Sequence, residues 1–173
     1  MKLLKLLSTA CSLLALGLIA HADPLQVGAP APDATGTDQE GKTVNLKEVY
    51  AKGPTLVYFY PKADTPGCTK QGCSLRDNWK ALQDKGIQVV GVSEDTVAEE
   101  KAFHDKFSFP FSLIADHDGK VAGAFGVPTN GGHAKRQSFL IKDGKIVWNM
   151  LDKTSTEGHA ADVLKAYESL AKN

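Results

Sequence analysis

The hydrophobic pattern of the chain alternates between short continuous apolar runs and longer stretches with helical spacing. Two runs, 55–61 and 87–92, are apolar at nearly every position, which is typical of strands buried on both faces of a sheet. Between them, a helix is predicted whose buried stripe contains Cys68, Gly72, Leu75, Trp79 and Leu82. Strand, helix and strand in this order predict a βαβ unit with parallel strands.

Further elements are predicted on both sides of this unit. Residues 25–40 are rich in Pro, Gly, Asp and Thr, which indicates turns and short edge strands. Thr96 and Glu99 form a capping-box pattern that opens the next helix. The remaining predictions are a strand at 111–116, a short helix at 121–125, a hairpin around Asp143-Gly144, and a final helix with apolar positions at Ala160, Val163, Leu164 and Tyr167. The pattern predicts an α/β fold whose last two strands are antiparallel, with no linker that would divide it.

The first 22 residues have the pattern of a secretory signal peptide. Lys2 and Lys5 precede an apolar run, and Ala20-His21-Ala22 matches a cleavage site. We expect cleavage before Asp23, which leaves a domain of residues 23–173 in a bacterial periplasm, with no membrane association after cleavage. The formal net charge of the chain is zero and no basic stripe is present, so nucleic acid is not expected as a partner.

Cleavage would leave two cysteines, Cys68 and Cys73. In an oxidising compartment, two cysteines usually form a structural disulfide. Their spacing argues against that role, because residues i and i+5 of one helix have Cα atoms roughly 8.7 Å apart, whereas disulfides rarely tolerate more than about 7 Å. A bridge would therefore have to unwind its own helix, which suits a redox cycle better than structural reinforcement.

Cys68 is placed to act as a nucleophile. It follows a buried strand and Pro66-Gly67, at the predicted start of the helix. Unpaired amide N–H groups and the positive end of the helix dipole favour the thiolate there. Four histidines, His104, His117, His133 and His159, show no ligand spacing, and we expect them at the surface.

The segment YPKADTPGCTKQGCSLRD, residues 60–77, resembles the active-site segment of the peroxiredoxins, in particular the bacterioferritin comigratory protein, or Q-type, branch. The P-x-x-x-[TS]-x-x-C signature of that family is matched by Pro61, Thr65 and Cys68. The similarity extends over nearly all of residues 23–173. It implies a thioredoxin-like fold with a central mixed sheet flanked by helices, and a thiol peroxidase without a metal or organic cofactor.

The resemblance also implies a role for each site residue. Cys68 would be the peroxidatic cysteine and Cys73 the resolving one; Thr65 would hydrogen-bond peroxide, and Pro61 would shield the site from water. Arg136, three residues before Phe139, matches the family's active-site arginine. Hydrogen peroxide and organic hydroperoxides would be the substrates, a thioredoxin-like or other dithiol the reductant, and the protein is expected to be a monomer that serves antioxidant defence.

Two alternatives remain open on the sequence. A copper-delivering metal carrier similar to the Sco proteins would use His133, although its C-x-x-x-C spacing is one residue shorter than that of Cys68 and Cys73. Copper binding that survives dialysis would favour it. A thiol–disulfide oxidoreductase acting on proteins would lack its usual C-x-x-C motif. Insulin reduction without peroxide turnover would favour that interpretation.

Overall fold

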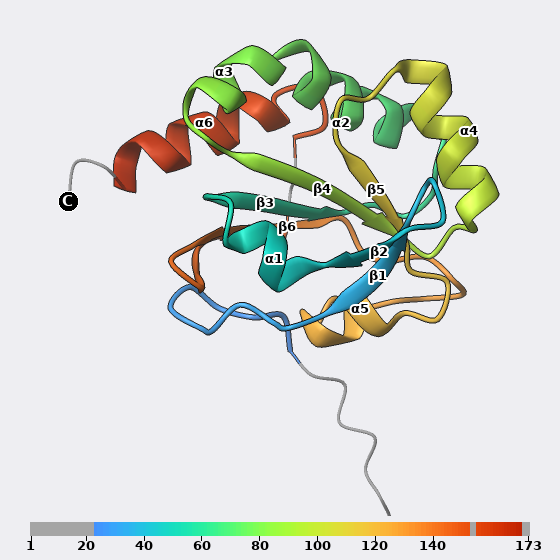
Figure 1. Ribbon diagram of the computed structural model, residues 1–173, viewed down its shortest axis with the longest axis horizontal. Coiled ribbons are helices and arrows are strands. Elements are labelled where there is room, and N and C mark those ends of the chain that lie inside the picture. Colours follow the sequence, from blue (N-terminus) through green and yellow to red (C-terminus); the bar gives the residue numbers. More distant parts are fainter. Residues whose placement is uncertain (1–22, 153–154, 171–173) are drawn as a thin grey trace, which may run out of the picture.

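A seven-stranded mixed sheet forms the middle layer of the computed structural model, which describes residues 23–152 and 155–170 (Figure 1). The strand order is β2-β1-β5-β4-β3-β6-β7. Neighbouring strands β3, β4 and β5 are parallel, and the other pairs are antiparallel. The strands are β1 Thr35–Asp38, β2 Thr43–Asn45, β3 Thr55–Phe59, β4 Gln88–Ser93, β5 Ser112–Ala115, β6 Gln137–Lys142 and β7 Lys145–Met150.

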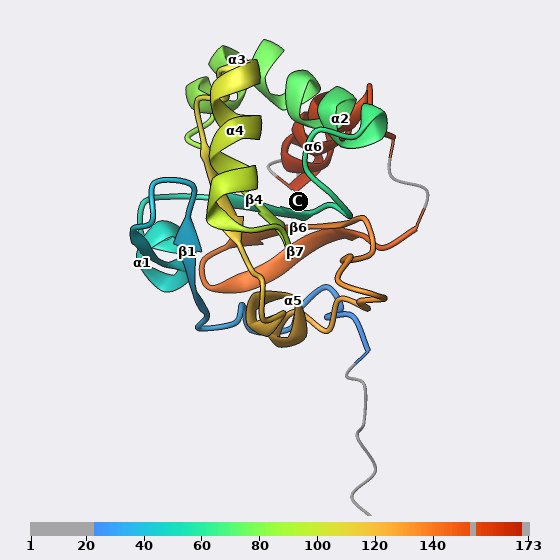
Figure 2. The ribbon, with the colours of Figure 1, turned by 90° about the vertical axis from the view of Figure 1, so that its right-hand side faces the viewer.

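Helices cover both faces of the sheet. Figure 2 shows α2, α3, α4 and α6 on one face and α1 and α5 on the other. The helices are α1 Leu46–Tyr50, α2 Pro66–Asp77, α3 Trp79–Asp84, α4 Val97–Phe107, α5 Lys120–Ala124 and α6 His159–Leu170. The predicted βαβ unit is confirmed, with β3 and β4 parallel and α2 and α3 between them. The fold is thioredoxin-like, as the resemblance implied.

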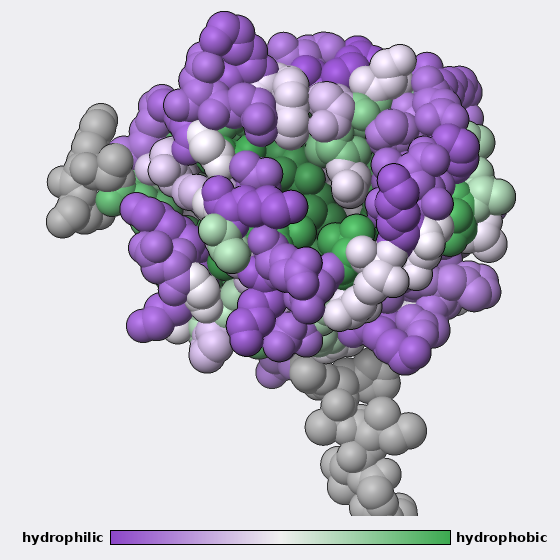
Figure 3. Space-filling view, viewed as in Figure 1, coloured by the Kyte–Doolittle hydropathy of each residue, from purple (hydrophilic) through white to green (hydrophobic). Residues whose placement is uncertain are grey.

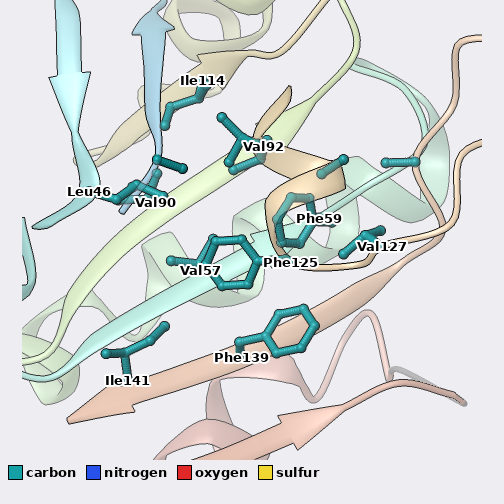
Figure 4. Packing of buried hydrophobic residues seen from close by; sticks show 14 of the residues in the cluster. Leu46, Val57, Phe59, Val90, Val92, Ile114, Phe125, Val127, Phe139 and Ile141 are labelled. Carbon is teal, nitrogen blue, oxygen red and sulfur yellow. The ribbon is translucent and has the colours of Figure 1, made fainter. Parts of the chain in front are cut away.

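Alternation along the strands divides the core into two clusters. In β3, Val57 and Phe59 point to the α1/α5 face, where they pack with residues of β4, β6 and α5 (Figure 4). Leu56 and Tyr58 point to the opposite face, with α2, α4 and α6. Both faces of the strand are therefore buried, which explains its continuous apolar run. The outer surface is mostly hydrophilic in the view of Figure 3, with apolar groups near its centre.

Three local predictions are confirmed. Thr96 and Glu99 form the reciprocal capping box, in which the Glu99 amide donates to Thr96 Oγ1 at 3.3 Å and the Thr96 amide donates to Glu99 Oε2 at 2.9 Å. The hairpin joins β6 and β7 through Asp143 and Gly144, whose φ angles of 51° and 72° fit a two-residue turn. The final helix is present as α6.

Other predictions were wrong in detail. The helix expected over residues 68–82 is two helices, because the backbone leaves helical geometry at Asn78, whose side chain donates to the Ser74 carbonyl at 2.9 Å. Strand β1 is interior, between β2 and β5, instead of lying at an edge. Helix α1, capped by the Asn45 side chain, was not expected.

No helix of the described residues has the length and apolar character needed to cross a membrane. The predicted signal peptide, residues 1–22, lies outside the described residues.

Candidate active site

Cys68 lies in the first turn of α2, directly after the loop that leaves β3. Thr65 is the N-cap, Pro66 is the first helical residue, and the first intrahelical bond runs from the Thr69 amide to the Thr65 carbonyl at 2.8 Å. The N–H groups of Gly67 and Cys68 precede that bond, so they have no acceptor within the helix. The Cys68 side chain is 2% exposed, and its thiol is free. A buried sulfur at the positive end of a helix is thus in place, as predicted.

Arg136 brings a positive charge to this sulfur. It precedes β6, and its Nη2 donates to Cys68 Sγ at 3.2 Å. The guanidinium also passes close to Gly67, where a Cβ would lie 3.4 Å from Nη2. The guanidinium also donates through Nη1 to Gln71 Oε1. Since Arg has only donors, it is fixed between a sulfur and a carbonyl oxygen, both of which accept.

Thr65 and Pro61 lie in the loop that carries Cys68 into the helix. The Thr65 hydroxyl donates to the Lys62 carbonyl at 2.9 Å and makes no capping bond to the helix. Its oxygen keeps lone pairs that can accept. The Pro61 carbonyl lies 3.0 Å from His133 Nδ1. These contacts fix the turn, and the roles of both residues toward peroxide stay predictions.

A buried acidic network supports the same loop from β4 and α4. The Asp95 carboxylate accepts the Ala63 amide at 2.7 Å and Lys62 Nζ at 3.1 Å. The Ser93 hydroxyl donates to Asp95 Oδ2 at 2.7 Å and also contacts Glu100. The Ser93 hydroxyl has one proton to donate, so the second of these two contacts requires a proton on one of the two carboxylates.

The environment of Glu100 is consistent with that proton. Its side chain is fully buried, and the Tyr60 hydroxyl donates to Oε2 at 2.5 Å. Burial raises the pKa of Glu100 to about 7, against the opposing effect of the hydrogen bonds from Ser93 and Tyr60. Neither Glu100 nor its role beneath the loop is predicted by the sequence, because its position in α4 carries no motif.

Cys73 occupies the same helix, one and a half turns beyond Cys68. It is half-buried and free, and burial raises the pKa of its thiol, with smaller effects from Arg76 and Asp77. Helix α2 is continuous from Pro66 to Asp77. Both cysteines therefore stand in one intact helix, which is the geometry that the spacing argument assumed.

The expectation of four surface histidines was wrong for His159. This residue, at the start of α6, is fully buried, with Gln71 Nε2 2.8 Å from its Nδ1 and Ser138 Oγ 3.3 Å from its Nε2. Burial, with a smaller effect from Arg136, lowers its pKa to about 4. His117 and His133 are exposed, as expected.

Gln71 and His159 were both missed as site residues. Gln71 had a usable signal, because a residue three positions after Cys68 lies on the same helix face. His159 had none, since it is 88 residues away from Gln71 in the sequence. Within residues 23–152 and 155–170, no three His, Cys, Asp or Glu side chains gather as a metal site.

Comparison with known proteins points to a single class, the thiol peroxidases built on a thioredoxin-like fold. Residues 27–149 match the model of the AhpC/TSA family. A peroxiredoxin Q from Triticum aestivum is 38% identical over 146 residues, which are 83% of this chain and 67% of that protein. The chain therefore belongs to the AhpC/TSA family, as a peroxiredoxin of the Q or bacterioferritin comigratory protein type.

Solved structures agree with this assignment. Peroxidoxin BcpB from Mycobacterium tuberculosis superposes with a TM-score of 0.80 and 32% identity, covering 84% of this chain and 98% of that one. The bacterioferritin comigratory protein of Xanthomonas campestris, whose alkyl peroxide reduction activity has been studied structurally, gives a TM-score of 0.74 and 30% identity, with coverage of 86% and 99%. The resemblance drawn from the segment around Cys68 is thereby confirmed.

Proposed function

We propose that this thiol peroxidase reduces hydrogen peroxide and organic hydroperoxides through Cys68. The observation that carries the proposal is the 3.2 Å contact between Arg136 Nη2 and Cys68 Sγ, because a fixed cation beside a buried sulfur stabilises the thiolate. The thiolate attacks one peroxide oxygen, the O–O bond breaks, and Cys68 becomes a sulfenic acid. The other oxygen leaves as hydroxide or alkoxide and takes up a proton, giving water or an alcohol.

The surrounding groups would stabilise charge as it moves from sulfur to oxygen. Arg136 supplies a positive charge with planar donors, and the N–H groups of Gly67 and Cys68, which have no acceptor within α2, could also donate to the developing charge. The Thr65 hydroxyl would donate to the peroxide once it rotates away from the Lys62 carbonyl, and Pro61 would limit the access of water to the sulfur.

Cys73 would resolve the sulfenic acid. Its thiol attacks the sulfur of Cys68, a Cys68–Cys73 disulfide forms, and the sulfenic oxygen leaves as water. An external dithiol, thioredoxin-like or otherwise, then reduces the disulfide and is itself oxidised to a disulfide. Since Cys68 and Cys73 share one chain, the cycle needs no second subunit, and we propose a monomer.

We also propose that the protein acts in the periplasm as part of antioxidant defence, after cleavage of residues 1–22. The A-x-A pattern at Ala20-His21-Ala22 supports this location. Cell fractionation of the full chain, with N-terminal sequencing of the periplasmic form, tests it. A product that begins at Asp23 agrees with the proposal, and retention of the whole chain in the cytoplasm contradicts it.

The catalytic proposal is tested by intact mass of the reduced protein seconds after one equivalent of hydrogen peroxide. We expect the loss of two hydrogen atoms in the parent protein, no change in C68S, and the gain of one oxygen in C73S. A trapping reagent specific for sulfenic acids should label only C73S. An unchanged mass of the parent protein over minutes would overturn the proposal, and an intramolecular loss of two hydrogen atoms in C73S would show that Cys73 is not the resolving residue.

A further inference from the structure

His159 is fully buried, yet both of its ring nitrogens have polar neighbours on two different elements. Gln71, on α2, lies 2.8 Å from Nδ1, and Ser138, on β6, lies 3.3 Å from Nε2. Helices α2 and α6 lie on the same face of the sheet, where the Ala160 amide also donates to Ser74 Oγ at 3.2 Å (Figure 2). A polar ring in this position requires an explanation, because an apolar side chain would fill the same volume.

The donors and acceptors around the ring determine its protonation. Arg136 can only donate, so the Gln71 amide must face it with the carbonyl oxygen. The amide nitrogen of Gln71 then faces His159 and also can only donate. Nδ1 of His159 must therefore accept, and it carries no proton. In the neutral ring the proton is on Nε2, which donates to the Ser138 hydroxyl.

We propose that His159 is a positioning residue for the reaction at Cys68: its unprotonated Nδ1 holds the Gln71 amide so that the amide oxygen faces Arg136, and this fixes the guanidinium on the sulfur. The proposal rests on the proposed function of Cys68. The low pKa of His159, about 4, keeps the ring neutral near pH 7. The charged group that faces it is Arg136, and the Tyr58 ring packs beside it at a centroid distance of 5.9 Å.

Without an acceptor at this position, the orientation of Gln71 is no longer determined. A leucine in place of His159 would leave the buried Nε2 amide without a partner, and the amide would turn toward other acceptors. The Gln71 side chain would then move away from Arg136, because a flip in place would direct its NH₂ group at a guanidinium that can only donate. Arg136 would then lose the contact that holds its plane, while its charge would remain.

The first test is the tautomer of His159, observed by NMR in the reduced protein with histidine-specific isotope labelling. The signal is assigned by its loss in H159N. We expect an unprotonated Nδ1 and a protonated Nε2. A proton on Nδ1, or a doubly protonated ring at neutral pH, would overturn the proposal, because Gln71 could not then donate to the ring.

The Q71E variant tests the same hydrogen bond between Gln71 and His159 by changing the donor instead of the acceptor. A carboxylate can still accept from Arg136, but it cannot donate to His159. We therefore expect Nδ1 to become protonated in Q71E, either by a change of tautomer or by charging of the ring. An Nδ1 that stays unprotonated in Q71E would show that Gln71 does not determine the state of the ring. H117N, at an exposed histidine, is the matched control and should leave the His159 signal unchanged.

The rate of Cys68 oxidation shows whether the hydrogen bond between Gln71 and His159 affects the reaction. Loss of one well-formed hydrogen bond corresponds to about a tenfold change, so H159L should slow oxidation by about that factor. H159N should recover most of the rate, because its Oδ1 can accept from Gln71 in place of Nδ1. Equal slowing in H159N and H159L, or none in H159L, would overturn the positioning role.

These experiments distinguish a failure of the positioning role of His159 from a failure of the proposed peroxidase function. If the parent protein does not react with peroxide, the peroxidase mechanism fails, whereas the tautomer in the parent and in Q71E still decides the hydrogen-bond assignment. Circular dichroism checks that each variant is folded. If H159L does not fold, Q71L supplies the kinetic comparison, because it removes the amide oxygen that Arg136 contacts: slower oxidation agrees with the proposal, and an unchanged rate overturns it.

Discussion

Arg136 Nη2 lies 3.2 Å from Cys68 Sγ, and no other charged side chain among the described residues donates a hydrogen bond to that sulfur. The arginine directly precedes β6, the strand on one side of β3, and the cysteine lies in the helix that follows β3, so the pairing exists only in the folded chain. A charge-assisted hydrogen bond of this kind is worth about 1.5–3 kcal/mol. Its removal should therefore be visible in the rate of the first chemical step.

We expect R136A to slow the oxidation of Cys68 by about a hundredfold, which corresponds to about 3 kcal/mol in the barrier. R136K should recover part of this loss, because it keeps the charge but cannot donate to Gln71 and Cys68 in one plane. The measurement is stopped-flow fluorescence after mixing with hydrogen peroxide, with Trp79 as the reporter. R76A, which removes an arginine that donates to the Phe107 carbonyl, is the control for loss of charge. An R136A rate equal to that of the parent protein would refute the role of Arg136.

The buried carboxyl of Glu100 should make stability depend on pH. Its pKa of about 7 in the folded protein is higher than the 4.5 of an exposed glutamate. The stabilisation from a neutral Glu100 is thus fully present below about pH 4.5 and is lost as pH rises through 7, by about 3 kcal/mol in total. His159 has the opposite dependence, since its lowered pKa of about 4 costs stability as pH falls from 6.5.

The E100Q variant isolates the contribution of Glu100. Its neutral amide fills the same volume, and the hydroxyl groups of Tyr60 and Ser93 can turn to pair with it. Urea unfolding of both proteins from pH 4 to 8 gives the difference between their free energies of unfolding. The contributions of His159 and the other titratable groups are the same in both proteins and cancel from this difference. We expect the parent protein to lose stability relative to E100Q as pH rises. A difference that does not change with pH would mean that Glu100 is not protonated in the folded protein.

Close packing of α2 against Phe109 predicts a further effect on stability. A Cβ at Gly72 would lie 2.6 Å from Phe109 Cζ, which real structures do not tolerate without movement. We expect G72A to lower the free energy of unfolding by about 1–3 kcal/mol through overpacking. G123A in α5 is the matched control, because nothing lies within 4 Å of its Cβ and alanine favours helix by about 0.5–1 kcal/mol. A G72A protein as stable as G123A would contradict the predicted overpacking.

The sequence predicts the parts of this molecule that depend on neighbouring residues. The buried run of β3, the cysteine at the start of α2 and the capping box at Thr96 are local patterns, and all three are present. The interior place of β1 depends on pairing with β5, about eighty residues away, and no local pattern encodes that choice. For the same reason His159 was wrongly expected at the surface: nothing in the sequence around it indicates burial, and it is buried by the packing of α6 against α2 and the sheet.

Oxidation should unwind the first turns of α2. Both cysteines lie in an unbroken helix, and its geometry puts their Cα atoms roughly 8.7 Å apart, beyond the reach of a disulfide. Formation of the Cys68–Cys73 bond must therefore break helical hydrogen bonds between them. It would also displace Gln71 from Arg136, and with it the contact to His159 on α6. A Cys68–Cys73 disulfide would thus break hydrogen bonds that the reduced enzyme makes at this point.

Hydrogen exchange with mass spectrometry measures this change directly. Amides of residues 69–73 should exchange faster in the oxidised protein, by at least tenfold, whereas amides of β3 and β4 should not change. The control is C73S treated with peroxide, which should hold a sulfenic acid on an intact helix and keep its protection. Unchanged protection of residues 69–73 in a single chain whose mass has fallen by two hydrogen atoms would mean that the disulfide forms without unwinding α2. A doubled mass would mean that the bond joins two chains, and the intramolecular cycle would then be wrong even if Cys68 is the residue that reacts with peroxide.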